Sequence, residues 1–266
     1  MDALRRFASQ RPMAFGVMMT FVLLALYVVA GIAAAVFSTV ATGQQTVEAL
    51  GRLAGSVVII WMLWRLGWVS DAGITRLGAW SAWLLILPFL AYQVVVHMFA
   101  FFGDLGFGLP DPAMAGAVAL NGSAAGLLEE LVFRGVILCA LLKVWVNSTG
   151  GLARSVLLSS FLFGAAHLIR IGLGQPVPVV SLLALDGLLA GIYYAAFVLY
   201  ARSVWPAVAI HALLNAVVGA SAVGTAGFEE TVSAWVLILV LELPAVAFGL
   251  YLLRRVRSST VAASGV

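Results

Sequence analysis

Residues 114–146 read MAGAVALNGSAAGLLEELVFRGVILCALLKVWV. This stretch is long and apolar enough to form a membrane-spanning helix, which needs about 20 apolar residues. It nevertheless carries Glu129, Glu130 and Arg134 near its middle. Charged groups cost roughly 2.5–3.5 kcal/mol each at the centre of a membrane helix, so they persist where they face a partner or a polar cavity. The stretch therefore predicts a membrane helix that lines a polar interior.

The rest of the chain has the same apolar character. Its 266 residues are 64% hydrophobic and only 9% charged, whereas soluble domains carry about 25% charged residues. Lipid must therefore contact most of the surface. The chain has one cysteine, Cys139, so an intramolecular disulfide is excluded. Residues 13–40 are too long for the apolar core of a signal peptide, which indicates a retained span.

The sequence predicts an all-α, polytopic membrane protein in which about eight helices enclose a polar cavity. No linker or internal repeat divides the chain, so we expect residues 1–266 to form a single domain. The fourth span is longer than one crossing needs, and we expect it to be tilted, or broken near Asn121-Gly122-Ser123. The predicted spans are 14–40, 48–67, 80–102, 114–146, 154–171, 178–201, 204–225 and 231–253.

Basic residues predict the orientation, because short cytoplasmic loops carry an excess of Lys and Arg. With the N-terminus in the cytoplasm, eleven of the 14 Lys and Arg residues fall on that side, while Glu229 and Glu230 are among the acids on the other side. An even number of crossings returns the C-terminus to the cytoplasm. We therefore predict a multi-pass protein of the plasma membrane with both termini cytoplasmic. The eleven residues are Arg5, Arg6, Arg11, Arg65, Arg76, Lys143, Arg154, Arg202, Arg254, Arg255 and Arg257.

Helical geometry separates the three charges of the fourth span. Glu130 and Arg134 are four residues apart, so they share a helix face and can form an ion pair. Glu129 is rotated by about 100° from Glu130 and has no partner in its own helix. An ion pair that only orients helices explains two of the charges and leaves Glu129 unexplained. An unpaired carboxylate inside an apolar span can accept a proton from water, so Glu129 is a candidate general base.

Two further pairs of side chains lie one helical turn apart in later spans. Phe163 and His167 share a face of the fifth span, and His211 and Asn215 share a face of the seventh. We therefore treat both histidines as candidate site residues. His97 has no such companion, and we interpret it as a hydrogen-bonded packing residue.

Two other acids lie inside predicted spans. Asp186 is interpreted as a structural partner of Arg134 or a helix-end group, with a role in the site as the alternative. Glu242 precedes Pro244 by two residues and is interpreted as an acceptor for groups that the proline frees.

Three patterns occur in order on three separate apolar spans: Glu-Glu-x-x-x-Arg at 129–134, Phe-x-x-x-His at 163–167 and His-x-x-x-Asn at 211–215. Together they resemble the CPBP family of intramembrane proteases, which includes the type II CAAX prenyl endopeptidases and the bacterial Abi proteins. The resemblance covers a motif-bearing core of approximately residues 110–225. It implies eight helices with both termini cytosolic, in agreement with the distribution of basic residues.

The resemblance also implies roles for the motif residues. Glu129 is expected to activate a water molecule that His167 helps to hold. His211 and Asn215 are expected to donate hydrogen bonds to the oxyanion of the tetrahedral intermediate. The supporting residues are Glu130, Arg134 and Phe163, of which the two charged ones fix the helix or position a substrate carboxylate.

Two mechanisms fit these residues. Metal-free hydrolysis, without any cofactor, is favoured because Asn215 is a suitable oxyanion donor and has no clear purpose beside a zinc ion. Zinc is the alternative cofactor, since two imidazoles and one carboxylate are a ligand set of catalytic zinc. Its ligands would be Glu129, His167 and His211.

We therefore predict an intramembrane endopeptidase that cuts a membrane-associated peptide or protein, lipidated ones included, near the cytoplasmic face. One alternative is a non-catalytic membrane protein with an immunity or scaffold role. Another is a transporter that uses Glu129 and Asp186 as ion sites, although paired broken helices in two related halves are not visible. No nucleic-acid partner is expected. The sequence predicts neither the identity of the substrate nor an oligomeric state.

Overall fold

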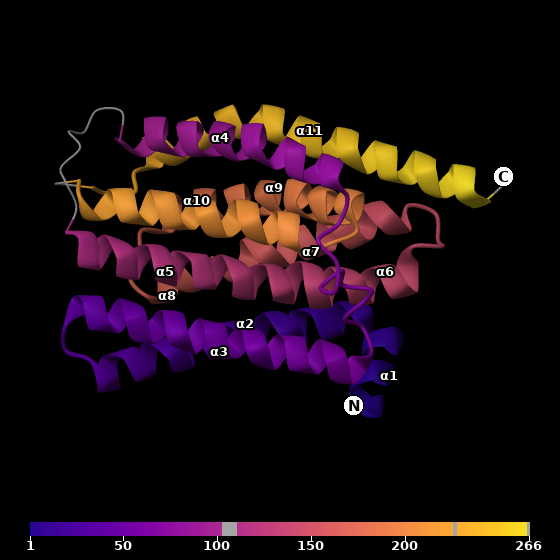
Figure 1. The fold of residues 1–266 in the computed structure, drawn as a ribbon, viewed down its shortest axis with the longest axis horizontal. Coiled ribbons are helices and arrows are strands. Elements are labelled where there is room, and N and C mark those ends of the chain that lie inside the picture. The colour runs from indigo at the N-terminus through magenta and orange to yellow at the C-terminus, as the bar shows by residue number, and fades with distance from the viewer. Residues whose placement is uncertain (103–110, 226–227, 265–266) are drawn as a thin grey trace.

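Helices form the whole architecture of the computed structural model, which describes residues 1–102, 111–225 and 228–264, with side chains through Val256. Within these ranges no strand occurs, which confirms the predicted all-α fold (Figure 1). Eleven α-helices and one π-helix, η1, follow one another in the described chain. They are α1 (Asp2–Gln10), α2 (Pro12–Phe37), α3 (Ala41–Leu66), α4 (Trp80–Phe102), α5 (Pro112–Glu130), η1 (Leu131–Leu138), α6 (Cys139–Trp145), α7 (Gly151–Ala166), α8 (Ile169–Gly172), α9 (Val177–Ala201), α10 (Trp205–Val223) and α11 (Val232–Ser264).

Seven helices among the described residues are long and apolar enough to cross a membrane. They are α2, α3, α4, α9 and α10, together with Gly151–Gly172, which contains α7 and α8, and Val232–Val256 of α11. The predicted fourth span is formed by α5, η1 and α6, which continue into one another from Pro112 to Trp145. The chain is therefore an integral, multi-pass membrane protein, and the predicted number of about eight spans is close.

The predicted boundaries hold to within a few residues except in two spans. α3 begins at Ala41 rather than at 48, because its polar first turns remain helical; Thr46 Oγ1, for example, donates to the carbonyl of Thr42 over 2.9 Å. α11 continues to Ser264 instead of ending near 253. Polar residues can extend a helix beyond the apolar part that sequence reasoning detects.

The fourth span departs from regular α-helix, but at a different position from the one predicted. α5 passes through Asn121-Gly122-Ser123 without a break, so the predicted break at this point is wrong. The helix instead changes to the π form over Leu131–Leu138, directly after the two glutamates, and all eight residues of this segment are buried. π-Helical turns are rare and occur frequently at functional sites, because the inserted residue changes which side chains face one direction.

Close helix contacts bring the candidate site residues together. α5 packs between α3 and α10, and α9 packs between α7 and α11. Glycines occupy the points of closest approach: a Cβ on Gly126 of α5 would lie 2.8 Å from the backbone nitrogen of Ala212, and one on Gly164 of α7 only 2.3 Å from the carbonyl oxygen of Ala184. Small residues are typical of such contacts between membrane helices. Both chain termini lie at the same end of the bundle (Figure 1).

Gly191 offers a test of the contact between α7 and α9. A Cβ at this position would lie 2.6 Å from the Cβ of Ser160, so we expect Gly191→Ala to force the helices apart. The cost should be about 1–3 kcal/mol, as for overpacked cores, and thermal unfolding of the purified protein in detergent measures it. Gly31→Ala is the matched control, because nothing lies within 4 Å of its added methyl. Equal melting temperatures for the two variants would contradict the close contact.

Candidate active site

Four predicted site residues face one cavity between the helices. Glu129, His167, His211 and Asn215 all line a cavity of about 400 Å³. Glu129 lies in the last turn of α5, His167 directly follows α7, and the other two lie in α10. The fold thus brings together residues from three segments that are far apart in the sequence.

Glu129 finds its partners outside its own helix, as the sequence predicts, and one of them comes from α2. The hydroxyl of Tyr27 donates to Oε1 of Glu129 over 2.5 Å. The other oxygen, Oε2, lies 3.8 Å from Nε2 of His211 and makes no closer ion pair within the described part of the chain. The side chain of Glu129 is 15% exposed, so one carboxylate oxygen is available to a water molecule in the cavity.

Tyr27 is itself positioned by a group that sequence reasoning did not assign to the site. The guanidinium of Arg52 lies 4.6 Å from the centroid of the Tyr27 ring, and it also pairs with Glu48 over 3.0 Å. Arg52 further donates to the side-chain oxygen of Asn121 in α5. The sequence does mark Arg52 as a candidate site residue, because it is a basic residue inside an apolar span. Its partner across the bundle could not be identified from spacing.

A single carboxylate oxygen of Glu130 interacts with two side chains, those of Arg134 and His211. Its Oε1 accepts a hydrogen bond from Nη1 of Arg134 over 2.9 Å. This confirms the predicted ion pair between the two residues, which are one helical turn apart. The same oxygen lies 2.9 Å from Nδ1 of His211 in α10. The Glu130 and Arg134 side chains are both 0% exposed. The ion pair therefore also fixes the imidazole of a neighbouring helix.

The two histidines are oriented by different acceptors. Nδ1 of His167 lies 3.0 Å from the carbonyl oxygen of Phe163, which can only accept a hydrogen bond. Nδ1 of His167 therefore carries a proton, and Nε2 of the neutral ring keeps its lone pair. Nδ1 of His211 faces the Glu130 carboxylate, so it also carries a proton. In both rings, Nε2 is the nitrogen left for chemistry.

Aromatic rings enclose the charged groups. The ring of Tyr194 stacks on His211 with centroids 5.1 Å apart. The Arg134 guanidinium lies 4.4 Å from the centroid of the Phe163 ring and 5.2 Å from that of Tyr194. Phe163 also contacts the His167 ring edge to face at 5.1 Å. These contacts limit the rotation of the charged groups that the rings surround.

Asn215 lies one turn beyond His211 and reaches toward α5. Its Nδ2 is 3.4 Å from the carbonyl oxygen of Gly122, which is a long hydrogen bond. At Gly122 an added Cβ would lie 3.0 Å from the backbone oxygen of Asn215, so the absence of a side chain permits this approach. The amide is therefore weakly held and lies at the cavity wall.

Two residues that sequence reasoning interpreted as structural also line the cavity. They are His97 and Asp186. Asp186 is not the carboxylate that pairs with Arg134, because Glu130 holds that position. One oxygen of Asp186 is buried without a hydrogen-bond partner among the described residues. The sequence could have identified Asp186 as a site residue, because it is an acid without a local partner in an apolar span, as Glu129 is.

The cavity extends away from the end of the bundle that carries the termini. Arg170 in α8 and Glu230 before α11 line its outer part, and their side chains form a 2.7 Å ion pair and are each 27% exposed. Figure 1 shows α8 at the end opposite the N and C labels. Phe163 and Tyr194, both buried, line its inner part. The exposed rim therefore lies on the side opposite the chain termini.

Glu129, His167 and His211 are the ligands that the alternative zinc mechanism would use. No group of three or more His, Cys, Asp or Glu side chains among the described residues is arranged to hold a metal ion. His211 directs Nδ1 to Glu130, and its Nε2 lies 3.8 Å from Oε2 of Glu129. We therefore derive no step through a metal.

Comparison with known families supports the resemblance drawn from the three motifs. Residues 111–217 match the family model described as type II CAAX prenyl endopeptidase Rce1-like, over less than half of the chain. This range contains all four cavity-lining candidates and matches the core expected at 110–225. No match was found among curated proteins or among solved structures. The family match indicates a hydrolase similar to the CAAX proteases that act within membranes.

Arg134 provides a test of the buried ion pair. Replacing it with Met leaves the Glu130 carboxylate buried without its guanidinium partner, so we expect a loss of about 3–5 kcal/mol in stability. Thermal unfolding in detergent measures the change. The double variant Glu130→Gln, Arg134→Met removes both charges and should recover part of the loss. A double variant less stable than Arg134→Met alone would contradict a mainly electrostatic role for the pair.

Proposed function

We propose that this protein is an intramembrane endopeptidase that hydrolyses a peptide bond of a membrane-associated polypeptide with a water molecule activated by Glu129. The main support is the convergence of a carboxylate, two imidazoles and an amide from α5, the end of α7 and α10 on one cavity. Each type of group that peptide hydrolysis needs is present there. The finer assignments below go beyond the family match and rest on the hydrogen bonds of this chain.

Glu129 and His167 are the groups that would activate water. Among the described residues, Oε2 of Glu129 has no closer ion-pair partner than His211 Nε2 at 3.8 Å, so it can accept a proton from water. Nε2 of His167 presents a lone pair because Nδ1 is bound to the Phe163 carbonyl. A water that donates to both acceptors has its oxygen lone pair free to attack a substrate carbonyl. Positioned general bases contribute on the order of 10²–10⁴-fold in rate.

His211 and Asn215 are the candidate donors to the oxyanion. Asn215 Nδ2 makes only a 3.4 Å hydrogen bond, so it can turn to a developing negative charge. His211 uses Nδ1 for Glu130, so it donates through Nε2 only as the imidazolium. Each oxyanion donor is worth roughly 10²–10³-fold in rate.

The side of access follows from two separate asymmetries. The outer, exposed part of the cavity lies opposite the termini, at Arg170 and Glu230. The basic residues are concentrated at the end with the termini, which favours a cytoplasmic location for that end. The protein would therefore receive its substrate from the extracytoplasmic half of the plasma membrane. This proposal replaces the expectation from sequence of a cut near the cytoplasmic face.

Glu129→Gln tests the proposed catalysis. The amide keeps the size of the side chain and an oxygen for Tyr27 but cannot take a proton, so cleavage should fall by at least ~10²-fold. The measurement is the set of new N-termini, found by mass spectrometry in membranes of cells that make each variant. Glu242→Gln is the matched control, since Glu242 is a buried carboxylate that bonds Gln93 and does not line the cavity.

Two results would change the proposal. If Glu129→Gln membranes contain the same new N-termini as the wild type, the non-catalytic immunity or scaffold alternative is favoured. If a chelator abolishes cleavage by the purified protein and zinc restores it, the zinc mechanism replaces the metal-free one.

Side-specific labelling tests the proposed access. Cys139 is buried and can be replaced with Ala, after which Glu229→Cys marks the end with the cavity rim and Arg65→Cys marks the end with the termini. We expect a membrane-impermeant maleimide to label Glu229→Cys in intact cells and Arg65→Cys only in inverted vesicles. The opposite pattern would assign the cavity to the cytoplasmic side.

A further inference from the structure

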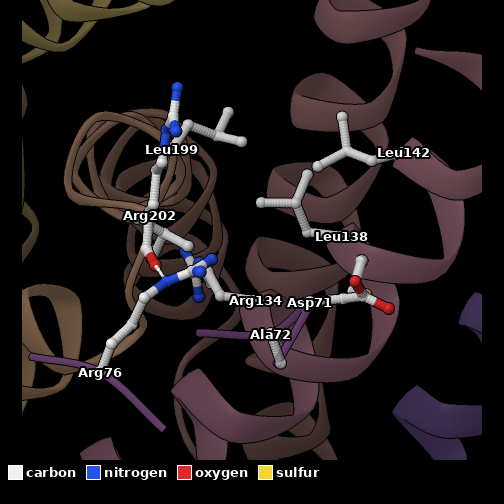
Figure 2. Close-up of a pocket in the computed structure, with 10 residues that line it drawn as sticks. Asp71, Ala72, Arg76, Arg134, Leu138, Leu142, Leu199 and Arg202 are labelled. Atoms are coloured by element: carbon white, nitrogen blue, oxygen red, sulfur yellow. Dashed lines mark hydrogen bonds between the residues drawn. The ribbon is translucent and has the colours of Figure 1, made fainter. Parts of the chain in front are cut away.

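A second, smaller pocket lies at the end of the bundle that carries the termini. It has a volume of about 150 Å³ and lies between the C-terminal part of α9, the segment from η1 to α6, and the connection that follows α3. Figure 2 shows Leu138 and Leu142 on one wall of this pocket and Leu199 on the facing one. The polar side chains that line it are Arg76, Arg134, Arg202 and Asp71.

The charges around this pocket are unbalanced. Asp71 forms an ion pair with Lys143, and Arg134 pairs with Glu130. Neither Arg76 nor Arg202 forms an ion pair within the part of the chain that the structure describes; Nε of Arg76 donates to the backbone carbonyl of Arg202. Two guanidinium groups at the pocket therefore lack a counter-charge.

Arg134 supplies a second and independent sign of a missing ligand. Its side chain is 0% exposed, yet Nε and Nη2 have no hydrogen-bond partner among the described residues. The rings of Phe163 and Tyr194 interact with the guanidinium but accept no conventional hydrogen bond from these N–H groups. Leaving a buried donor unpaired costs about 1–3 kcal/mol, and more for a charged group. An external acceptor at the pocket would remove this cost.

The arrangement of the arginines indicates where such an acceptor would bind. Figure 2 shows the side chains of Arg76 and Arg134 converging beside α9, while Arg202 extends in another direction past Leu199. Arg76 and Arg202 are exposed, whereas Arg134 is buried. The inner part of the pocket is therefore lined by two guanidinium groups, and Arg202 lies at its rim.

We propose that this pocket binds the phosphate group of an anionic phospholipid. Guanidinium groups bind phosphate oxygens through paired hydrogen bonds. The pocket volume corresponds to about five water molecules at roughly 30 Å³ each, enough for a phosphate group and too small for a whole lipid. The acyl chains extend outside it, past Leu142 on one wall and Leu199 on the facing one. Basic pockets between membrane helices on the cytoplasmic side typically bind anionic head groups.

A zwitterionic lipid fits this pocket less well. A zwitterionic head group carries a cationic group beside its phosphate, and Arg76 and Arg202 would repel that group. An anionic head group instead has a net negative charge, which can balance the two arginines. The bound phosphate would also contact Arg134, which holds Glu130 and through it His211. If the proposed protease function holds, the lipid thus acts on the same hydrogen bonds that orient the catalytic imidazole.

Lipid binding to the purified protein tests the proposal without an activity assay. The probes are phosphatidylglycerol, phosphatidylcholine and inorganic phosphate, and the measurements are native mass spectrometry and thermal unfolding in detergent. We expect phosphatidylglycerol at about 100 times its Kd to raise the melting temperature by about 5 °C. Phosphatidylcholine should have a much smaller effect. An equal shift with inorganic phosphate would overturn the lipid assignment in favour of a soluble anion.

Variants of exposed arginines connect the binding to the pocket. Arg76→Gln should weaken phosphatidylglycerol binding at least ~10-fold, and Arg76→Lys, which keeps a charge without the paired donors, should have an intermediate effect. Arg65→Gln is the matched control, because Arg65 is exposed at the same end but lies over Trp61, outside the pocket. Equal binding by Arg76→Gln, Arg76→Lys and Arg65→Gln would overturn the proposal.

Discussion

The hydrogen bonds to Oε1 of Glu130 hold the site together. One oxygen atom, buried in the middle of the bundle, accepts from Arg134 on the same helix and from His211 on α10. Water is scarce at this depth, so the loss of Arg134 would leave the Glu130 carboxylate without its guanidinium partner. The positions of α5, η1 and α10 are therefore tied to one carboxylate. Its neighbour Glu129 can remain available to water because Glu130 takes the structural role.

This division of roles between adjacent glutamates explains the shape of the interior. The helical period directs Glu129 toward the cavity and Glu130 toward Arg134, and the π-helix begins at the next residue, Leu131. Glycines at the contacts of α5 with α10 and of α7 with α9 let the helices approach closely enough for these short side chains to meet. Arg134 connects the two pockets of the bundle, since it lines the smaller one and pairs with the glutamate behind the larger one.

Spacing in the sequence predicted most of the candidate site but not its neighbours. The ion pair of Glu130 and Arg134 follows from an i, i+4 spacing, and apolar composition predicted the all-helical membrane fold. Tyr27 could not be assigned from the sequence, because its contact with Glu129 joins residues on helices that no local pattern relates. Asp186 was interpreted as a structural partner of Arg134, but Arg134 pairs with Glu130 and Asp186 lines the cavity. The π-helix could not be predicted either, because no local pattern in residues 131–138 distinguishes it from an α-helix.

The protonation of His211 tests the central role of Glu130 most directly. The chain has three histidines, so solid-state NMR of ¹⁵N-histidine-labelled protein in bilayers can assign the His211 signals by comparison with a His211→Gln variant. A hydrogen bond to Oε1 of Glu130 predicts a protonated Nδ1 in the wild type and a changed Nδ1 shift in Glu130→Gln. An unprotonated Nδ1 in the wild type, or a shift that Glu130→Gln leaves unaltered, would contradict the shared carboxylate and the site built around it.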